Sequence, residues 1–441
     1  MISSPLSVVH FSTSDSHGAH RATYLLHRAL LSSGVQSEML VKFKTNTDPS
    51  VSIVGKPTFP ERLRSSLDPK SALGSFYLET RRSLRIRLGK PMHSFNENTN
   101  TLILRDALPH LSKVDIILLS WIDGFLSTGM IRRLYEQTRA PIIWTLMDAE
   151  PVTGGCHYPG TCRGYTRRCG LCPQLPLRKE QDLSRKNWLA KYADLSDLPI
   201  TFVAPSRWLR KKVKSSSLFR ARRVEHILLS VDTRLFRTAS KEVARRSLQL
   251  PSDKHVVFFG ARSMAEERKG MRYFVEALQI LKERLRKTRS FRPQSVLWLS
   301  AGERLPDVDF GFPLKHFGFV YDMRTLARLY QASDVFACSS IEDGGPMMIN
   351  EAIMCATPTV AFDTGVAPDL ITSGERGYVA KIRDAKDFAQ GLYRSLTLTS
   401  RGSPSFTEKR CFPFYQARSY RKLFSEVIIS HSKGHPNEKH A

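Results

Sequence analysis

Residues 335–363 read VFACSSIEDGGPMMINEAIMCATPTVAFD, a pattern that predicts a strand, a helix and a second strand in direct succession. The first apolar run stops at Ser339 and Ser340. Pro346 suits the first turn of the helix, because its fixed φ and missing N–H are tolerated there. Both apolar runs are continuous, which is typical of strands that helices cover on both faces. The stretch therefore predicts one unit of a parallel α/β sheet.

The same alternation continues through almost the whole chain. Strands are predicted at residues 7–12, 114–121, 141–147, 200–205, 224–229, 255–261, 295–302, 316–320, 335–340 and 359–363. The helical segment 18–34 has apolar residues at helical spacing and ends at a glycine. We predict an α/β fold with two doubly wound Rossmann-like domains that face each other across a cleft.

The pattern restarts after a polar, basic stretch at residues 231–255, which we interpret as the connection between the domains. The predicted parts are an N-terminal Rossmann-like domain (1–235) with a cysteine-rich insertion (154–175), a C-terminal Rossmann-like domain (250–400), a helical segment (405–431) packing back toward the N-terminal domain, and a flexible tail (432–441). Residues 56–95 are less regular and very basic, and either a membrane or acceptor contact or a solvated surface fits them.

The composition narrows the class of protein. Of the 441 residues, 41% are hydrophobic, enough for large cores, so general disorder is excluded. Lys and Arg number 67 against 41 Asp and Glu, a formal net charge of +26. The expected partner is therefore anionic: a phosphate-rich small molecule, an anionic membrane surface or nucleic acid. No nucleic-acid-binding module is recognised, so a nucleic-acid partner is not expected.

The location is inferred from what the sequence lacks. The N-terminal residues do not have the pattern of a signal peptide. No apolar stretch approaches the ~18 residues that span a bilayer. Seven cysteines, an odd number, favour a reducing compartment. We expect a cytoplasmic protein, with peripheral contact at the anionic inner face of the cytoplasmic membrane as a further option.

Carboxylates and glycines gather between the strand and the helix of the opening stretch. Gly344 and Gly345 let the backbone approach a ligand closely, and the helix start offers unpaired amides to phosphate. Glu351 shares an apolar helix face, where a carboxylate needs a partner such as a hydroxylated ligand. The purely structural alternative is an Asp near a helix start and a Glu paired with an arginine.

The longer stretch 338–380 resembles the donor-site region of the retaining family 4 glycosyltransferases, which have the GT-B architecture. In that family an acid follows the strand, and a Glu lies eight residues further along, on the helix. Asp343 and Glu351 stand at these two places, with Asp343 replacing the usual Glu and Glu342 one position early. The resemblance implies that Glu351 holds the ribose hydroxyls and Asp343 contacts the donor sugar or its loop.

Residues 258–278, FFGARSMAEERKGMRYFVEAL, are similar to the first strand and loop of the family's C-terminal domain. There Arg262 and Lys269 match the two cations that bind the donor diphosphate. A forked Arg and a point-charge Lys near a phosphate neutralise negative charge as it develops. The resemblance therefore implies that both cations, with the amides near Gly344 and Gly345, stabilise the departing diphosphate.

The N-terminal half carries further matches to the same family. Residues 10–35 resemble its opening strand, glycine loop and helix, with Gly18 permitting close approach of a substrate and His20 contacting the acceptor. Residues 141–175 are similar to a branch in bacterial exopolysaccharide and surface-glycan synthesis. The candidate cleft residues are Asp148, Trp121 and Asp123.

Two positions depart from this branch. Met147 stands where a His usually precedes Asp148, and Ser120 stands where a His usually precedes Trp121. Of the cleft residues, Asp148 joins Arg262, Lys269 and Asp343 in the implied catalytic set. Ordinary loop roles are the alternative for Trp121, Asp123 and Asp148.

Four cysteines are concentrated in the insertion. Cys156, Cys162, Cys169 and Cys172 have the spacing C-x5-C-x6-C-x2-C. Four thiolates form a closed structural zinc site, and the final CGLC resembles a zinc knuckle. Free thiols and disulfides remain alternatives, and His157 is a substitute ligand.

The resemblance implies transfer of a sugar from a nucleoside-diphosphate sugar to a glycan or lipid-linked acceptor, with retention at the anomeric carbon. No cofactor or divalent metal is expected for this chemistry. The alternatives are a sugar-nucleotide epimerase or hydrolase, an inactive sugar-nucleotide-binding scaffold and, less favoured, a nucleic-acid-binding protein. The sequence leaves the donor, acceptor and linkage open.

Overall fold

The structure is a computed structural model, and it describes residues 5–16, 18–56, 95–287, 292–302, 309–397 and 408–434. The chain divides into two compact units. Unit 1 consists of Met1–Pro205, Leu209–Ile227 and Gln416–Ala441, and unit 2 consists of Ser206–Trp208 and Leu228–Tyr415. Of the basic stretch 56–95, which fits either a membrane or acceptor contact or a solvated surface, residues 57–94 lie outside the described residues.

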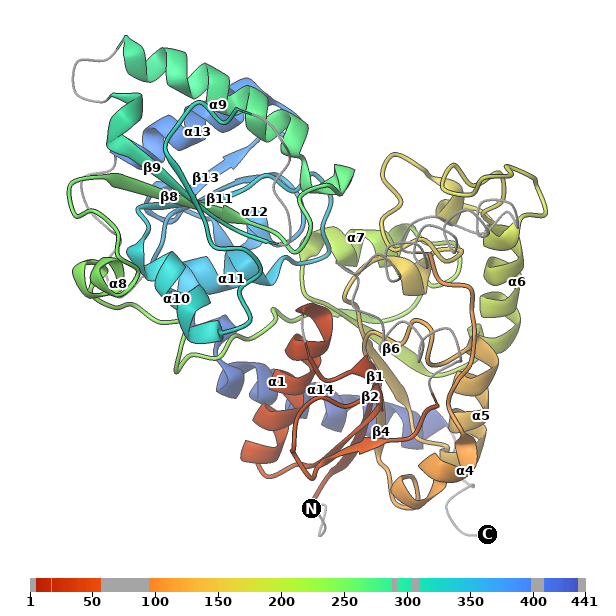
Figure 1. Cartoon of the computed structure of the whole chain (residues 1–441). Helices are drawn as coiled ribbons and strands as arrows, with labels where there is room; N and C mark the ends of the chain where they lie inside the picture. Colours follow the sequence, from red (N-terminus) through yellow and green to blue (C-terminus); the bar gives the residue numbers. More distant parts are fainter. Residues whose placement is uncertain are drawn as a thin grey trace, which may run out of the picture. The chain divides into compact units, whose positions relative to one another are not determined.

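Unit 1 contains a parallel sheet of seven described strands (Figure 1). They are β1 (Ser7–Ser14), β2 (Gln36–Phe43), β3 (Val51–Ile53), β4 (Ile116–Leu119), β5 (Ile142–Thr145), β6 (Ile200–Ala204) and β7 (Val224–His226), in the order β3-β2-β1-β4-β5-β6-β7. The strand order reverses direction between β1 and β4. The carboxyl ends of these two strands therefore form a topological switch point, where open α/β sheets bind ligands.

Helices cover the sheet of unit 1. They are α1 (Gly18–Ser32), α4 (Leu104–Ala107), α5 (Thr128–Thr138), α6 (Leu183–Leu195), α7 (Arg207–Ser215) and α14 (Pro413–Gly434). The last helix packs Tyr420 and Phe424 against Val8 and Leu118 in one core cluster, together with Leu26 of α1. The buried Tyr420 hydroxyl also hydrogen-bonds the Thr145 hydroxyl at 2.7 Å. From Gln416 onward, α14 is therefore part of the core of unit 1.

Unit 2 repeats the same plan. Its parallel strands are β8 (His255–Gly260), β9 (Val296–Ala301), β10 (Leu314–His316), β11 (Val335–Cys338), β12 (Thr359–Phe362) and β13 (Gly377–Ala380), in the order β10-β9-β8-β11-β12-β13. Its helices are α8 (Lys241–Ser247), α9 (Met271–Arg286), α10 (Met323–Ala332), α11 (Met347–Met354), α12 (Ala367–Leu370) and α13 (Ala385–Thr397). The switch point here lies between β8 and β11.

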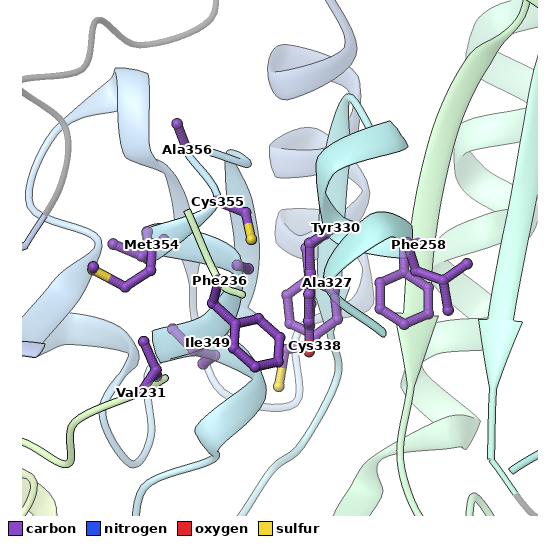
Figure 2. Close-up of a cluster of buried hydrophobic side chains, with 14 of the residues drawn as sticks. Val231, Phe236, Phe258, Ala327, Tyr330, Cys338, Ile349, Met354, Cys355 and Ala356 are labelled. Carbon is purple, nitrogen blue, oxygen red and sulfur yellow. The ribbon is translucent and has the colours of Figure 1, made fainter. Parts of the chain in front are cut away.

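The two faces of this sheet bury separate clusters. Val257 and Phe259 of β8 point to the cluster under α9 and α13. The alternate residue Phe258 points to the cluster under α10 and α11, as expected for a strand with period two. Figure 2 shows this second cluster, with Phe236 beside Ile349 and with Tyr330 between Phe236 and Phe258. Because both faces are apolar, these strands appear in the sequence as continuous apolar runs.

The predicted fold class is confirmed, since both units are doubly wound parallel α/β sheets. Nine of the ten predicted strands occur within three residues of their predicted ends, and the structure adds β2, β3 and β13. The exception is the strand predicted at 316–320, because β10 occupies Leu314–His316. Helix α11 begins at Met347 with Pro346 as its N-cap, one residue later than expected. Helix α14 continues to Gly434, so residues 432–434, predicted as tail, are helical.

Within the part of the chain that the structure describes, no helix combines the length and the apolar character that crossing a bilayer needs.

Candidate functional site

The first candidate site lies at the switch point of unit 2. The loop after β8 carries Arg268 and Lys269, and the loop after β11 carries Asp343. Because parallel strands end at the same edge of the sheet, two loops separated by about 70 residues meet there. The backbone holds them together: the Ile341 N–H donates to the Arg268 carbonyl at 2.8 Å, and the Ser339 hydroxyl donates to the Lys269 carbonyl at 2.8 Å.

A glycine makes this close approach of the loops feasible. Gly270 has φ +69°, in the left-handed region that favours glycine. A Cβ on Gly270 would lie 2.0 Å from the Ser339 carbonyl oxygen and 3.1 Å from the Ile341 side chain. The residue that ends the cationic loop is therefore sterically required to be glycine.

The cations of this loop pair with Asp343. Lys269 Nζ donates to Asp343 Oδ2 at 2.8 Å, and Arg268 Nη1 donates to the same oxygen at 3.2 Å. Burial raises the pKa of the Asp343 carboxyl, but the Lys269 and Arg268 cations and the Gly345 N–H outweigh burial and hold the pKa below its usual range. The cluster thus contains two cations around one ionised carboxylate.

The other predicted donor residues surround this cluster in sequence. The Gly345 N–H donates a hydrogen bond to Asp343 Oδ1 at 3.3 Å. The Gly344 carbonyl accepts a hydrogen bond from the buried Ser206 hydroxyl at 2.5 Å. Glu342 is half-buried, and Arg262 is exposed just after β8. The Gly345 amide thus has a carboxylate partner, and the role of the amides near Gly344 and Gly345 toward a diphosphate stays a prediction.

Glu351 is buried on α11, as the apolar face of that helix predicts. Its Oε2 accepts a hydrogen bond of 3.0 Å from the Tyr330 hydroxyl of α10. Burial, and then the neighbouring Glu351 carboxylate, raise the pKa of Tyr330 well above its ordinary value. The Tyr330 hydroxyl is thus one protein partner of this carboxylate.

The second candidate site lies at the carboxyl edge of the sheet in unit 1. Trp121 and Asp123 follow β4, Asp148 follows β5, and His20 lies in the first turns of α1. The structure adds His157, from the cysteine-rich insertion. His157 stacks on Trp121 with ring centroids 4.7 Å apart, and the Trp121 and His20 rings meet edge to face at 6.0 Å.

His157 joins two carboxylates. Its Nδ1 lies 2.6 Å from Asp148 Oδ2, and its Nε2 lies 3.2 Å from Asp123 Oδ2. Burial by itself lowers the pKa of His157, but Asp148 and then Asp123 raise it to about 10. An imidazolium donates from both ring nitrogens, so it fits this pair of acceptors at neutral pH. Asp148 is buried, whereas the Asp123 side chain is 30% exposed and presents the accessible end of the triad.

Gly18 and His20 complete the predicted set in unit 1. His20 Nδ1 lies 3.0 Å from the Ser12 hydroxyl, which orients the ring toward Trp121. Gly18 has φ +50°, but a Cβ on it would meet nothing within 4 Å among the described atoms. The left-handed backbone conformation by itself favours glycine here, and the close approach of a substrate stays a prediction.

Sequence reasoning missed three members of these sites. Arg268 was passed over beside Lys269, Tyr330 was not connected with Glu351, and His157 was considered only as a zinc ligand. A usable signal existed for His157: Met147 removes the histidine expected before Asp148, and the next histidine along the chain supplies an imidazole to the same aspartate.

The four cysteines of the insertion are free thiols. Burial raises the pKa of Cys156 and Cys172, and raises that of Cys169 to about 11. Among the described residues, no group of three or more His, Cys, Asp or Glu is placed to hold a metal ion. The geometry gives the zinc site no support, so it stays a prediction. The disulfide alternative is not what the structure contains.

Comparison with known proteins bears on the cationic loops of unit 2. Residues 253–397 match the model of a family described as Glycosyl transferases group 1. The match covers β8 to α13, and so includes Arg262, Lys269, Asp343 and Glu351 within one glycosyl transferases group 1 domain.

Solved structures resemble the whole chain. A glycosyltransferase from Rickettsia africae has a TM-score of 0.59 at 14% identity, covering 96% of this chain and 99% of its own. Anabaena HepE with UDP and glucose gives 0.58 at 13%, covering 96% and 100%. Sucrose-phosphate synthase from Thermosynechococcus elongatus gives 0.55 at 16%, covering 97% and 98%. No curated protein sequence matches the chain.

The comparisons confirm the predicted resemblance at the level of the family and the fold. The chain has the GT-B type of architecture, with a glycosyl transferases group 1 domain in unit 2. The prediction of a glycosyltransferase of the GT-B type is therefore confirmed in this coarse form.

Proposed function

We propose that the protein transfers a sugar from a nucleoside-diphosphate sugar to a glycan or lipid-linked acceptor, with retention at the anomeric carbon. The single observation that carries the proposal is the Arg268–Lys269–Asp343 cluster at the switch point of the unit that matches the glycosyltransferase family. Two solved structures of Anabaena HepE, which this chain resembles, contain UDP with glucose or UDP-glucose.

The cluster suits a diphosphate leaving group. Breaking the bond between the sugar and the diphosphate places negative charge on the phosphate oxygens, and preorganised cations stabilise that charge. Lys269 and Arg268 already face a carboxylate, so an incoming diphosphate competes with Asp343 for them. Arg262, exposed just after β8, is proposed as a third cation for the diphosphate. Glu351 is proposed to hold the ribose hydroxyls.

The His157 triad is proposed as the acceptor-side group. The imidazolium fixes the position of the Asp123 carboxylate, and the accessible end of Asp123 can accept a hydrogen bond from a sugar hydroxyl. Trp121 offers an aromatic face to the same region. In the proposed reaction the acceptor oxygen attacks on the side from which the diphosphate leaves, and the leaving phosphate takes the acceptor proton.

The setting is proposed from the sequence. We propose that no divalent metal is needed for transfer, and that the work belongs to exopolysaccharide or surface-glycan synthesis. A cytoplasmic location with peripheral contact to an anionic membrane accords with the net charge of +26.

Calorimetric titration with UDP-, GDP- and ADP-sugars, with no metal added, tests the donor site. One nucleotide class is expected to bind, and Lys269→Ala is expected to weaken it roughly tenfold or more, since charge-assisted hydrogen bonds contribute about 1.5–3 kcal/mol. Lys386→Ala, at an exposed position of α13 in the same unit, is the matched control and should bind normally.

Two outcomes would overturn the proposal. Folded protein that binds no nucleotide sugar, or Lys269→Ala that binds and turns over like the wild type, removes the donor site. Products formed from the donor alone, with no acceptor present, would instead establish an epimerase or hydrolase. Activity that survives a chelator supports metal-independent transfer, and loss of activity contradicts it.

A further inference from the structure

A cavity of about 660 Å³ opens in unit 1, and none of its lining residues belongs to the two candidate sites. It is formed by three segments: the cysteine-rich insertion, the start of α6 and the turn after α7. Its lining residues are Gly164, Thr166, Arg167, Arg168, Cys169, Gly170, Leu171, Glu180, Arg185, Trp188, Ser217 and Arg220. Figure 1 shows the insertion in yellow, beside α6.

Hydrogen bonds hold the three segments together. The Gly170 N–H donates to the Ser184 hydroxyl at 2.9 Å, which joins the insertion to the start of α6. The Ser217 N–H donates to the Tyr165 carbonyl at 3.0 Å, and the Trp188 Nε1–H donates to the Ser217 hydroxyl at 3.0 Å. The three segments that form the wall of the cavity are therefore hydrogen-bonded to one another.

A glycine allows two parts of the wall to pack closely. Gly170 has φ +93°, and a Cβ on it would lie 2.4 Å from the Glu180 carbonyl oxygen and 3.3 Å from Arg185 Nε. This close packing places the guanidinium of Arg185 against the backbone of the insertion, where its Nε is buried.

The charge of the cavity is strongly one-sided. Four arginines line it, Arg167, Arg168, Arg185 and Arg220, against the single carboxylate of Glu180. Glu180 is 75% exposed and lies 3.8 Å from Arg185 Nη2, so it compensates little of this charge. The Nε of Arg185 is buried and has no hydrogen-bond partner among the described residues. A buried donor without a partner is costly, and an acceptor entering the cavity would relieve that cost.

We infer that this cavity binds a phosphate-bearing group, and a diphosphate in particular. Guanidinium forks match phosphate oxygens with two parallel hydrogen bonds, and an excess of three positive charges suits a group with several negative ones. Leu171 and Trp188 add apolar and aromatic surface beside the arginines. The inference does not depend on the proposed function, because every lining residue belongs to unit 1 and the proposed donor site belongs to unit 2.

Titration with inorganic pyrophosphate at low salt tests the cavity. The wild type is expected to bind, and the affinity should fall as salt screens the charges. Arg185→Gln and Arg220→Gln should each weaken binding roughly tenfold. Arg220 is exposed, so its replacement is expected to leave folding intact if Arg185→Gln does not fold. Arg105→Gln, whose side chain is 88% exposed on α4 of the same unit, removes the same charge elsewhere and should bind normally.

Vesicles separate the two sources of phosphate. If phosphatidylglycerol vesicles, but not phosphatidylcholine vesicles, bind the wild type, lose binding to Arg220→Gln and release protein on addition of pyrophosphate, the ligand is a lipid phosphate. If pyrophosphate binds but the vesicles do not distinguish the variants, the ligand is a soluble phosphate compound. Absence of pyrophosphate binding, or equal weakening by Arg105→Gln, overturns the inference. Nucleotide-sugar binding should be unchanged in every variant, which keeps this test separate from that of the donor site.

Discussion

Lys269 and Asp343 hold each other in a buried ion pair, and this pair is also the centre of the proposed donor site. Their side chains are only 14% and 11% exposed, and their charged atoms lie 2.8 Å apart. Removing one partner of such a pair leaves the other charge buried and poorly compensated. Loss of activity in a single variant therefore has two causes to be separated.

A double-mutant cycle separates them. Lys269→Met should lower the free energy of unfolding by about 3 kcal/mol at pH 7, because the Asp343 carboxylate then loses one of the two cations that pair with it. Lys269→Met combined with Asp343→Asn should recover part of that loss, since no buried charge is stranded. Urea unfolding measures both, with Lys386→Met as the control. Recovered stability without recovered nucleotide binding assigns the lysine a direct part in binding, whereas additive losses in stability would contradict the coupling.

The pH dependence of stability tests His157. Its pKa is about 10 in the folded protein, above the unfolded value of 6.5. The stabilisation by the imidazolium is therefore complete below pH 6.5 and is lost as the pH rises toward 10. In this window the free energy of unfolding should fall by up to about 1.4 kcal/mol per pH unit.

His157→Gln removes the titrating group and should flatten this slope. Urea unfolding at intervals from pH 6.5 to 9.5 measures it. Gln keeps an amide donor for Asp148, which limits the structural damage. A wild-type slope identical to that of His157→Gln would show that the imidazole is neutral in the fold.

Some strands are predictable from the sequence alone, and others are not. β4 and β5 have the sequences IILL and IIWT and are fully buried. In an α/β chain, such continuous apolar runs predict buried strands. β2, QSEMLVKF, was missed because Glu38 and Lys42 interrupt it. Lys42 is nevertheless buried, since its ammonium donates to the Gly124 carbonyl at 2.7 Å. That compensation depends on a residue 82 positions away, which local pattern cannot show.

The site residues also divide into those that local motifs predict and those whose contacts depend on distant parts of the chain. Lys269 and Asp343 were each predicted from local motifs, but their direct contact depends on the strand order, which places β8 beside β11. His157 and the arginine-lined cavity depend on the path of the cysteine-rich insertion, a segment without regular periodicity. Periodicity predicts elements well, and it says little about where an irregular segment returns to the sheet.

The loop before α9 offers a test of this geometry. Gly270→Ala places a Cβ 2.0 Å from a backbone oxygen and imposes a left-handed φ on alanine. The loop must shift, at a cost of about 2 kcal/mol or more in the free energy of unfolding, and Lys269 shifts with it. Nucleotide-sugar affinity and urea unfolding should both fall. Gly374→Ala is the control, because its Cβ would meet nothing within 4 Å and its φ is not positive. Equal effects of the two substitutions would contradict the steric argument.

The two units differ in how they should respond to acid. Unit 1 buries His10 of β1 and His27 of α1, with ring centroids 5.4 Å apart. Burial, and then His27, lower the pKa of His10 well below its ordinary value, and burial lowers the pKa of His27 to about 4. Both ring nitrogens of His10 lack a hydrogen-bond partner among the described residues, whereas those of His27 contact Ser37 and Ser50. Both rings are therefore neutral in the fold and protonate readily only after unfolding.

This difference predicts selective opening of unit 1. As the pH falls from 6.5 toward 4, these two histidines become protonated in the unfolded chain but stay neutral in the folded protein. The free energy of unfolding therefore decreases by up to about 1.4 kcal/mol per pH unit for each histidine. Hydrogen exchange followed by mass spectrometry, corrected for intrinsic rates, should show protection falling between pH 7 and 5 in β1 and β4 but not in β8 and β11. His10→Phe should reduce the loss in unit 1, whereas His316→Phe, at an exposed position of β10 in unit 2, should not. Equal loss of protection in both units would mean that carboxylates across the chain, and not this pair of histidines, set its acid sensitivity.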